Sequence, residues 1–224
     1  MQLCIALDMS SKNENLALLK VLQEFNLWVK IGLRSFIRDG KEFLKEIKAI
    51  NPNFKIFLDL KLYDIPNTMA TATSECIALG VDMLTIHASS GIEGMQAVSA
   101  VAKDSSLLVF AVTALTSFED NTFVPIYNTP IALHTKTLAL LAQEGGCNGV
   151  VCSAHESKEI KACTSLLTLT PGIRFNDNLA QDQKRIATPK SAKEANADFI
   201  VVGRPIYQAQ NPKSIVEKIY KEIQ

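Results

Sequence analysis

The sequence predicts an α/β protein with a (β/α)8 barrel, the TIM-barrel architecture, in a single domain that spans residues 1–224. Eight short apolar segments, rich in β-branched residues, alternate along the chain with segments of helical periodicity. This alternation is typical of parallel strands joined by right-handed crossovers. Eight such units within 224 residues favour a closed barrel over an open doubly wound sheet.

The first half of the chain predicts four strands, each followed by a helix. Ser11 and Glu14 form a capping box at the start of the first helix, after which leucines recur at helical spacing. Pro52 ends the second helix and Gly80 ends the third. The expected strands cover residues 3–7, 28–32, 54–58 and 83–88, and the expected helices cover residues 11–25, 35–50, 68–79 and 91–101.

The second half repeats this alternation with longer connections. The strand at 107–112 is followed by a polar connection over 113–130, and the strand at 166–170 by a polar loop over 173–187. Pro189 is expected at the first position of a helix. The other strands are expected at 149–153 and 199–203, and the other helices at 131–144, at 156–162 and from 211 onward.

The third strand ends in a charged stretch, Asp59-Leu60-Lys61-Leu62-Tyr63-Asp64-Ile65-Pro66-Asn67-Thr68. Strand side chains alternate between two faces, so Asp59 and Lys61 are expected to point the same way. Opposite charges at the end of an apolar strand are costly to desolvate unless they pair. Pro66 ends the strand, and Asn67 or Thr68 is expected to cap the next helix. Alone, this Asp-x-Lys pair fits a structural ion pair as well as a catalytic site.

The positions of other polar residues favour the catalytic interpretation. Active sites of barrels lie at the C-terminal ends of the strands. Charged residues that only stabilised the fold could lie equally well at the opposite end of the barrel. The residues that fall at the C-terminal ends are Asp8, Lys30, Asp59, Lys61, Thr116, Arg174 and Arg204.

A phosphate site is predicted after the seventh and eighth strands, which is the usual phosphate-binding place in this architecture. The segments there supply Arg174, Gln183 and the pair Gly203-Arg204. Guanidinium groups bind phosphate oxygens well. For Arg204 alone, an ordinary ion pair is as good an interpretation, but its place after the last strand favours phosphate.

Composition limits the partners of the protein. The chain carries 23 basic and 23 acidic residues, so it has no general attraction to nucleic acid or to an anionic membrane. It has no run of membrane-spanning length and no signal peptide, and its five cysteines lack Cys-x-x-Cys spacing. Its histidines lack metal-ligand spacing. We therefore expect a soluble cytoplasmic protein whose histidines do not hold a metal ion.

Six segments resemble the signature segments of the orotidine 5′-phosphate decarboxylase family, in particular its bacterial branch. The resemblance follows their order and spacing along nearly the whole chain. It implies a cofactor-free barrel that converts orotidine 5′-phosphate to UMP and CO2, the last step of de novo pyrimidine synthesis. The segments are Ala6–Asp8, Val29–Gly32, Asp59–Thr68, Val112–Thr116, Thr170–Arg174 and Val202–Pro205.

The resemblance also implies roles for individual residues. Lys61 would donate a proton to C6 of the pyrimidine, within a charge network of Lys30, Asp59, Lys61 and Asp64. The family forms homodimers with shared active sites, so Asp64 and Thr68 would come from the partner subunit. Asp8 and Lys30 would bind the ribose, Thr116 the pyrimidine, and Arg174, Gln183 and Arg204 the phosphate. The full expected binding set is Asp8, Lys30, Asp59, Lys61, Asp64, Ile65, Pro66, Asn67, Thr68, Thr116, Arg174, Gln183, Gly203 and Arg204.

Two other functions remain open from the sequence. A related barrel enzyme that acts on a keto-sugar phosphate shares the Asp-x-Lys-x-x-Asp motif. Such enzymes use Mg²⁺ held partly by a carboxylate at the end of the second strand, where this chain has Lys30, which would repel the metal. A non-catalytic nucleotide- or phosphate-binding barrel is the other alternative, although a sensor has no need of a buried alternating charge network.

Overall fold

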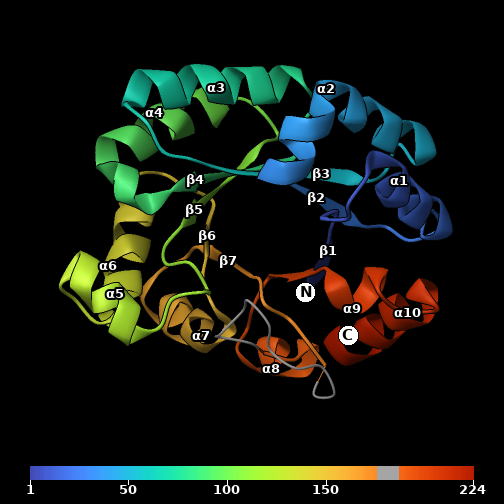
Figure 1. Ribbon diagram of the computed structural model, residues 1–224. Coiled ribbons are helices and arrows are strands. Elements are labelled where there is room, and N and C mark those ends of the chain that lie inside the picture. The colour runs from blue at the N-terminus through green and yellow to red at the C-terminus, as the bar shows by residue number, and fades with distance from the viewer. Residues whose placement is uncertain (176–186) are drawn as a thin grey trace.

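The computed structural model is a closed barrel of eight parallel strands, in which β1 pairs with both β2 and β8 (Figure 1). The structure describes residues 1–175 and 187–224. The expected barrel is therefore confirmed, and its strands are neighbours in the order in which they occur along the chain. The strands are β1 Gln2–Ala6, β2 Trp28–Gly32, β3 Lys55–Leu62, β4 Met83–His87, β5 Leu108–Val112, β6 Gly149–Val151, β7 Leu167–Thr170 and β8 Phe199–Val202.

The helices surround the barrel, and most lie within a few residues of the expected positions (Figure 1). The capping box of Ser11 and Glu14 is present at the start of α1. The helices are α1 Lys12–Val21, α2 Leu33–Ile50, α3 Pro66–Ala78, α4 Gly91–Ala102, α5 Asp120–Tyr127, α6 Ile131–Glu144, α7 Ala154–Cys163, α8 Pro189–Glu194, α9 Arg204–Tyr207 and α10 Pro212–Ile223, with a short 3-10 helix, η1, at Ala88–Ser90.

Two expectations about the connections are wrong. The stretch expected as a polar connection contains α5, whose Phe123 is buried and stacks on Tyr127 with ring centroids 4.4 Å apart. Pro125 lies inside this helix, and its presence hid the helical pattern in the sequence. The cap expected at Asn67 or Thr68 is also wrong, because α3 already begins at Pro66, with proline at its first position.

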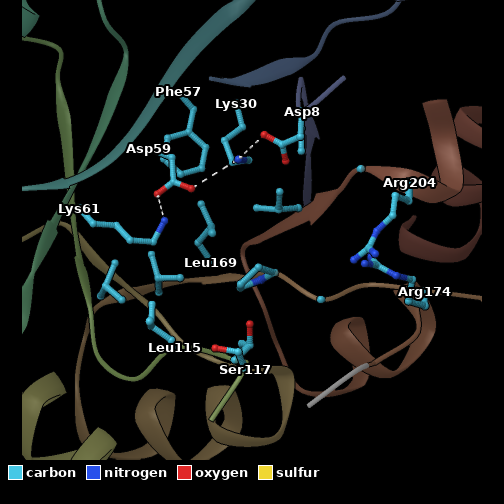
Figure 2. A pocket seen from close by; sticks show the side chains of 18 of the residues that line it. Asp8, Lys30, Phe57, Asp59, Lys61, Leu115, Ser117, Leu169, Arg174 and Arg204 are labelled. Atoms are coloured by element: carbon cyan, nitrogen blue, oxygen red, sulfur yellow. Dashed lines mark hydrogen bonds and ion pairs between the residues drawn. The ribbon is translucent and has the colours of Figure 1, made fainter. Parts of the chain in front are cut away.

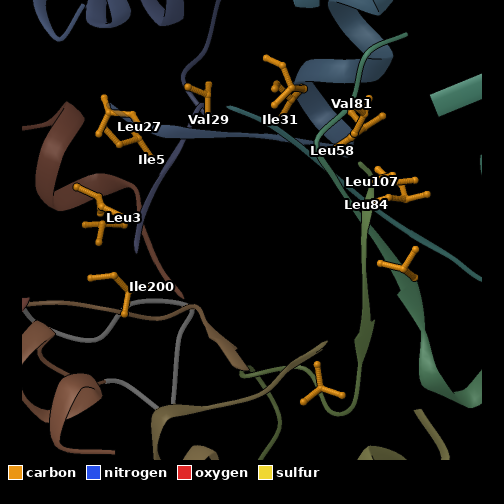
Figure 3. Close-up of a cluster of buried hydrophobic side chains, with 14 of the residues drawn as sticks. Leu3, Ile5, Leu27, Val29, Ile31, Leu58, Val81, Leu84, Leu107 and Ile200 are labelled. Carbon is orange, nitrogen blue, oxygen red and sulfur yellow. The ribbon is translucent and has the colours of Figure 1, made fainter. Parts of the chain in front are cut away.

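The core has two main layers, one between the strands and the surrounding helices and one inside the barrel. Alternate residues of each strand belong to different layers. Leu3, Ile5 and their counterparts on other strands face the surrounding helices (Figure 3). The alternate residues form a second buried cluster within the barrel, and several of them also line the pocket described below. That cluster contains Cys4, Ala6, Phe57, Met83, Phe110, Val112, Val151, Leu169, Phe199 and Val201.

This alternation explains why charged residues reach the barrel interior. Lys30 lies between Val29 and Ile31, which face the helices, so its own side chain points inward. Asp59 follows the outward-facing Leu58 in the same way.

Among the described residues, no helix has the length and apolar character needed to cross a membrane.

Candidate active site

A pocket of about 470 Å³ opens at the C-terminal ends of the strands (Figure 2). Its wall combines charged side chains with apolar ones from the interior cluster, such as Phe57, Val112 and Leu169. The strand-end residues expected from the sequence are thus brought to one cavity. Those that line it are Asp8, Lys30, Asp59, Lys61, Thr116, Arg174, Gly203 and Arg204.

Lys30 lies between two carboxylates. Its Nζ is 3.4 Å from Oδ1 of Asp8 and 3.5 Å from Oδ2 of Asp59. Burial lowers the pKa of Lys30, but the two carboxylates outweigh burial and hold that pKa above its ordinary value. Gly32 makes room for this ammonium group, because a Cβ at that position would lie 3.0 Å from Nζ. Lys30 is therefore a fixed cation in the pocket.

Asp59 is the central carboxylate of the site. Its Oδ1 lies 2.7 Å from Nζ of Lys61 and accepts a 2.9 Å hydrogen bond from the Thr85 hydroxyl. Burial raises the pKa of Asp59, but the charges of Lys30 and Lys61 outweigh it and hold the pKa below its ordinary value. Asp59 therefore stays ionised near neutral pH, between two ammonium groups.

Lys61 has an unusual backbone conformation, with φ of 52°, in the left-handed region. The pairing of β3 with β4 is irregular between Leu58 and Leu62, and Lys61 lies within that irregular segment. The prediction that Asp59 and Lys61 would point the same way and pair is confirmed by their ion pair. The local departure from regular strand geometry was not predicted.

Arg174 and Arg204 lie at the other end of the pocket, away from Lys61, and their side chains point toward one another in Figure 2. Arg174 follows β7, and its amide donates to the carbonyl of Ala187 at 2.8 Å. Arg204 follows Gly203 directly after β8, where a Cβ would come within 3.3 Å of Ala6. The pocket therefore has an end of alternating charge and an end with two guanidinium groups.

Known proteins resemble this chain along nearly its whole length. The model of the "Orotidine 5'-phosphate decarboxylase / HUMPS family" matches residues 1–219. The chain belongs to this family. A protein of a Nitratiruptor species named orotidine 5'-phosphate decarboxylase is 59% identical over 223 residues, covering 98% of each chain. One of the same name from Sulfurimonas denitrificans is 51% identical over the full length of both chains.

Solved structures of the family share the barrel. The crystal structure of orotidine 5'-phosphate decarboxylase from Lactobacillus acidophilus superposes with a TM-score of 0.86. It is 33% identical in sequence, and the match covers 100% of this chain and 99% of that one. The resemblance noted in the sequence is thereby confirmed at the level of the family and the fold.

The segment after β3 stands apart from the pocket. Asp64, Ile65, Asn67 and Thr68 are exposed, and Pro66 is partly so; none of the five lines the cavity of its own chain. The Asp64 carboxylate accepts a 2.7 Å hydrogen bond from the next amide in the chain, that of Ile65. These family-derived binding residues are therefore not brought to the site by this subunit alone. Gln183, the remaining one, lies outside the described residues.

Sequence reasoning missed several residues of the site. Ser117 and Tyr207 line the pocket, and Thr85 bonds to Asp59 from β4. The only sequence signal for Thr85 was a polar residue inside the apolar run Met83–Ile86. Among the described residues, no group of three or more His, Cys, Asp or Glu side chains is placed to bind a metal ion.

Proposed function

We propose that this protein decarboxylates orotidine 5′-phosphate to UMP and CO2, the final step of de novo UMP synthesis, without a cofactor. The observation that carries the proposal is the alternating array Asp8–Lys30–Asp59–Lys61 at one end of a pocket that has two arginines at the other. This arrangement suits a substrate with a reacting carboxylate at one end and a phosphate at the other. Its curated relatives at 50–59% identity carry that enzyme's name.

Lys61 has the central role in the proposed reaction. The bond between C6 and the carboxylate breaks, its electron pair stays on C6, and CO2 leaves. This carbanion lies in the plane of an sp² ring that cannot delocalise it, so a nearby ammonium must stabilise the charge. Lys61 then gives a proton from Nζ to C6 and is itself reprotonated by solvent.

Asp59 and Lys30 support this chemistry electrostatically. The ionised Asp59 holds the Lys61 ammonium at 2.7 Å and would face the substrate carboxylate. The repulsion between these two carboxylates would disappear as CO2 leaves. Lys30 keeps Asp59 charged and, with Asp8, would bind the ribose hydroxyls. Thr116, on the segment after β5, would contact the pyrimidine.

The phosphate would bind at the arginine end. Arg174 and Arg204 enter the pocket from the segments after β7 and β8, and guanidinium groups form paired hydrogen bonds with phosphate oxygens. Gly203 and Gln183 belong to the same proposed subsite. Binding energy from the phosphate can hold the pyrimidine ring against Lys61, so a remote group contributes to the rate.

We further propose a homodimer with shared active sites. Asp64 through Thr68 lie outside the pocket of their own chain, and the two neighbours of Asp64, Tyr63 and Ile65, expose 64% and 66% of their surface. Large apolar side chains exposed around a carboxylate fit a contact with a second copy. In the dimer, Asp64 of one subunit would complete the array of the other.

The test is decarboxylation of orotidine 5′-phosphate, followed by loss of its absorbance, in excess EDTA. We expect full activity with the chelator and no stimulation by Mg²⁺, because the Lys30 ammonium occupies the position where a metal would need a carboxylate. The Lys30→Glu variant should be inactive with or without Mg²⁺. Activity that EDTA removes and Mg²⁺ restores would favour a keto-sugar phosphate substrate instead.

A further inference from the structure

Thr85 lies in the middle of β4 and is completely buried between apolar neighbours. A buried hydroxyl that lacks hydrogen bonds costs about 1–3 kcal/mol, so its partners reveal why it is there. Thr85 does not line the pocket. Its hydroxyl oxygen instead contacts two residues of β3, Asp59 and Lys61, which do.

The three residues form a closed ring of hydrogen bonds. The Lys61 backbone amide donates to Oγ1 of Thr85 at 3.0 Å, and the Thr85 hydroxyl donates to Oδ1 of Asp59 at 2.9 Å. The same Oδ1 accepts from Nζ of Lys61 at 2.7 Å, the bond drawn in Figure 2. An amide can only donate and an ionised carboxylate can only accept, so the hydroxyl proton must point to Asp59.

This ring compensates for a break in the sheet. Between the pairs Leu58–Leu84 and Leu62–Ile86, β3 advances four residues while β4 advances two. Lys61 lies in this bulge with φ of 52°, a conformation that costs a residue with a side chain roughly 1–2 kcal/mol. The Thr85 side chain supplies the acceptor for the Lys61 amide there.

The ring also assigns one carboxylate oxygen to each lysine. Oδ1 of Asp59 receives both Lys61 and Thr85, while Oδ2 faces Lys30 at 3.5 Å. Rotation of the carboxylate would break the bond to Thr85. Thr85 therefore fixes the plane of Asp59 and the backbone of Lys61 at the same time.

We propose that Thr85 is a positioning residue, which holds the Lys61 ammonium at the reacting carbon through this ring. The inference rests on the proposed function of Lys61 as proton donor. Removal of the hydroxyl frees both the strained backbone of Lys61 and the Asp59 carboxylate, so the ammonium loses its fixed place. Removal of the hydroxyl should slow the chemical step and leave the affinity for the nucleotide unchanged, because the two arginines lie at the other end of the pocket.

The experiment compares Thr85→Val, which keeps the shape and loses the hydroxyl, with Thr85→Ser, which keeps the hydroxyl. Misplacement of a catalytic group by about 1 Å can cost about 10²-fold in rate. We expect that loss for Thr85→Val in single-turnover decarboxylation, with the Kd for UMP within about threefold of wild type. Thr85→Ser should recover to within about tenfold of the wild-type rate.

Thr73→Val is the matched control. Thr73 is also completely buried, but it lies on α3 and its hydroxyl donates to the Met69 carbonyl at 2.8 Å. This variant should lose similar stability in thermal unfolding and keep the wild-type turnover rate. A loss of turnover as large as that of Thr85→Val would mean that any buried threonine behaves in this way, and would overturn the proposal.

Two outcomes at Thr85 itself also overturn it: a folded Thr85→Val with a single-turnover rate within about threefold of wild type, or a Thr85→Ser as slow as Thr85→Val. If Thr85→Val does not fold, Thr85→Cys replaces it, because a thiol is close to a hydroxyl in size but bonds weakly. Equal rates for Thr85→Cys and Thr85→Ser then contradict the inference.

Lys61→Ala, measured alongside, separates the two proposals. If this variant stays active, the proposed function fails, whatever the Thr85 variants show.

Discussion

The two ends of the pocket are built in different ways. At the lysine end, opposite charges alternate at separations of 2.7–3.5 Å, from Asp8 after β1 through Lys30 on β2 to Asp59 and Lys61 on β3. At the arginine end, Arg174 and Arg204 have the same charge and come from segments that follow β7 and β8. At the lysine end the chain pairs its own opposite charges, whereas at the arginine end two guanidinium groups line the same cavity, an arrangement that suits an anionic ligand.

This difference suggests a division of work. Strand residues held by several partners can place a proton donor accurately, which the chemical step requires. Guanidinium groups facing a common space can attract and orient a phosphate without taking part in bond breaking. Substitutions at the lysine end should therefore reduce the chemical rate, and substitutions at the arginine end should reduce affinity.

The largest effect is expected for Lys61→Ala. Loss of the ammonium removes both the charge that stabilises the carbanion and the proton that quenches it, so turnover should be lost while the protein stays folded. Lys55→Ala is the control, since Lys55 is at the opposite end of β3 and pairs with Asp82 at 2.8 Å. A decarboxylation rate within about tenfold of wild type, roughly 1.4 kcal/mol of barrier, would contradict the role of Lys61.

The second prediction concerns Asp64, which would complete the charged array from a partner subunit. If Asp64 completes the site of a partner subunit, Lys61→Ala and Asp64→Ala chains are each inactive alone but complement each other when mixed. Random pairing makes half of the dimers mixed, each with one intact site, so activity should recover to about a quarter of wild type.

The control for this mixing experiment is Lys61→Ala mixed with the double variant Lys61→Ala/Asp64→Ala, which has no intact site in any pairing. Activity is measured after the chains have been unfolded and refolded together, so that subunits exchange. If the first mixture stays as inactive as the control mixture, Asp64 does not act across subunits.

The lysine end and the barrel were largely predictable from the sequence, for a physical reason. Apolar strands alternate with helices, and strand periodicity predicted that Asp59 and Lys61 share a face. The two side chains do pair in the pocket, although the backbone at Lys61 departs from regular strand geometry. The left-handed conformation of Lys61 and its bond to Thr85 were not predictable, because they depend on how β3 is matched to β4. The helix α5 was missed because Pro125 lies inside it and because the burial of Phe123, which stabilises the helix, is a tertiary effect.

The arginine end should respond more mildly, and only toward ligands that carry phosphate. Arg204→Ala removes charged hydrogen bonds worth about 1.5–3 kcal/mol, which corresponds to roughly 10- to 150-fold weaker binding of UMP. Uridine, which lacks the phosphate, should bind the variant and the wild type equally. Both affinities can be measured by calorimetry.

Arg204→Lys sharpens this test, because lysine keeps the positive charge but loses the planar fork of donors. If the fork itself matters, the lysine variant should bind UMP with an affinity between those of the wild type and Arg204→Ala. If instead UMP and uridine lose affinity equally in Arg204→Ala, the arginine supports the shape of the whole pocket, and the division of work between the two ends does not hold.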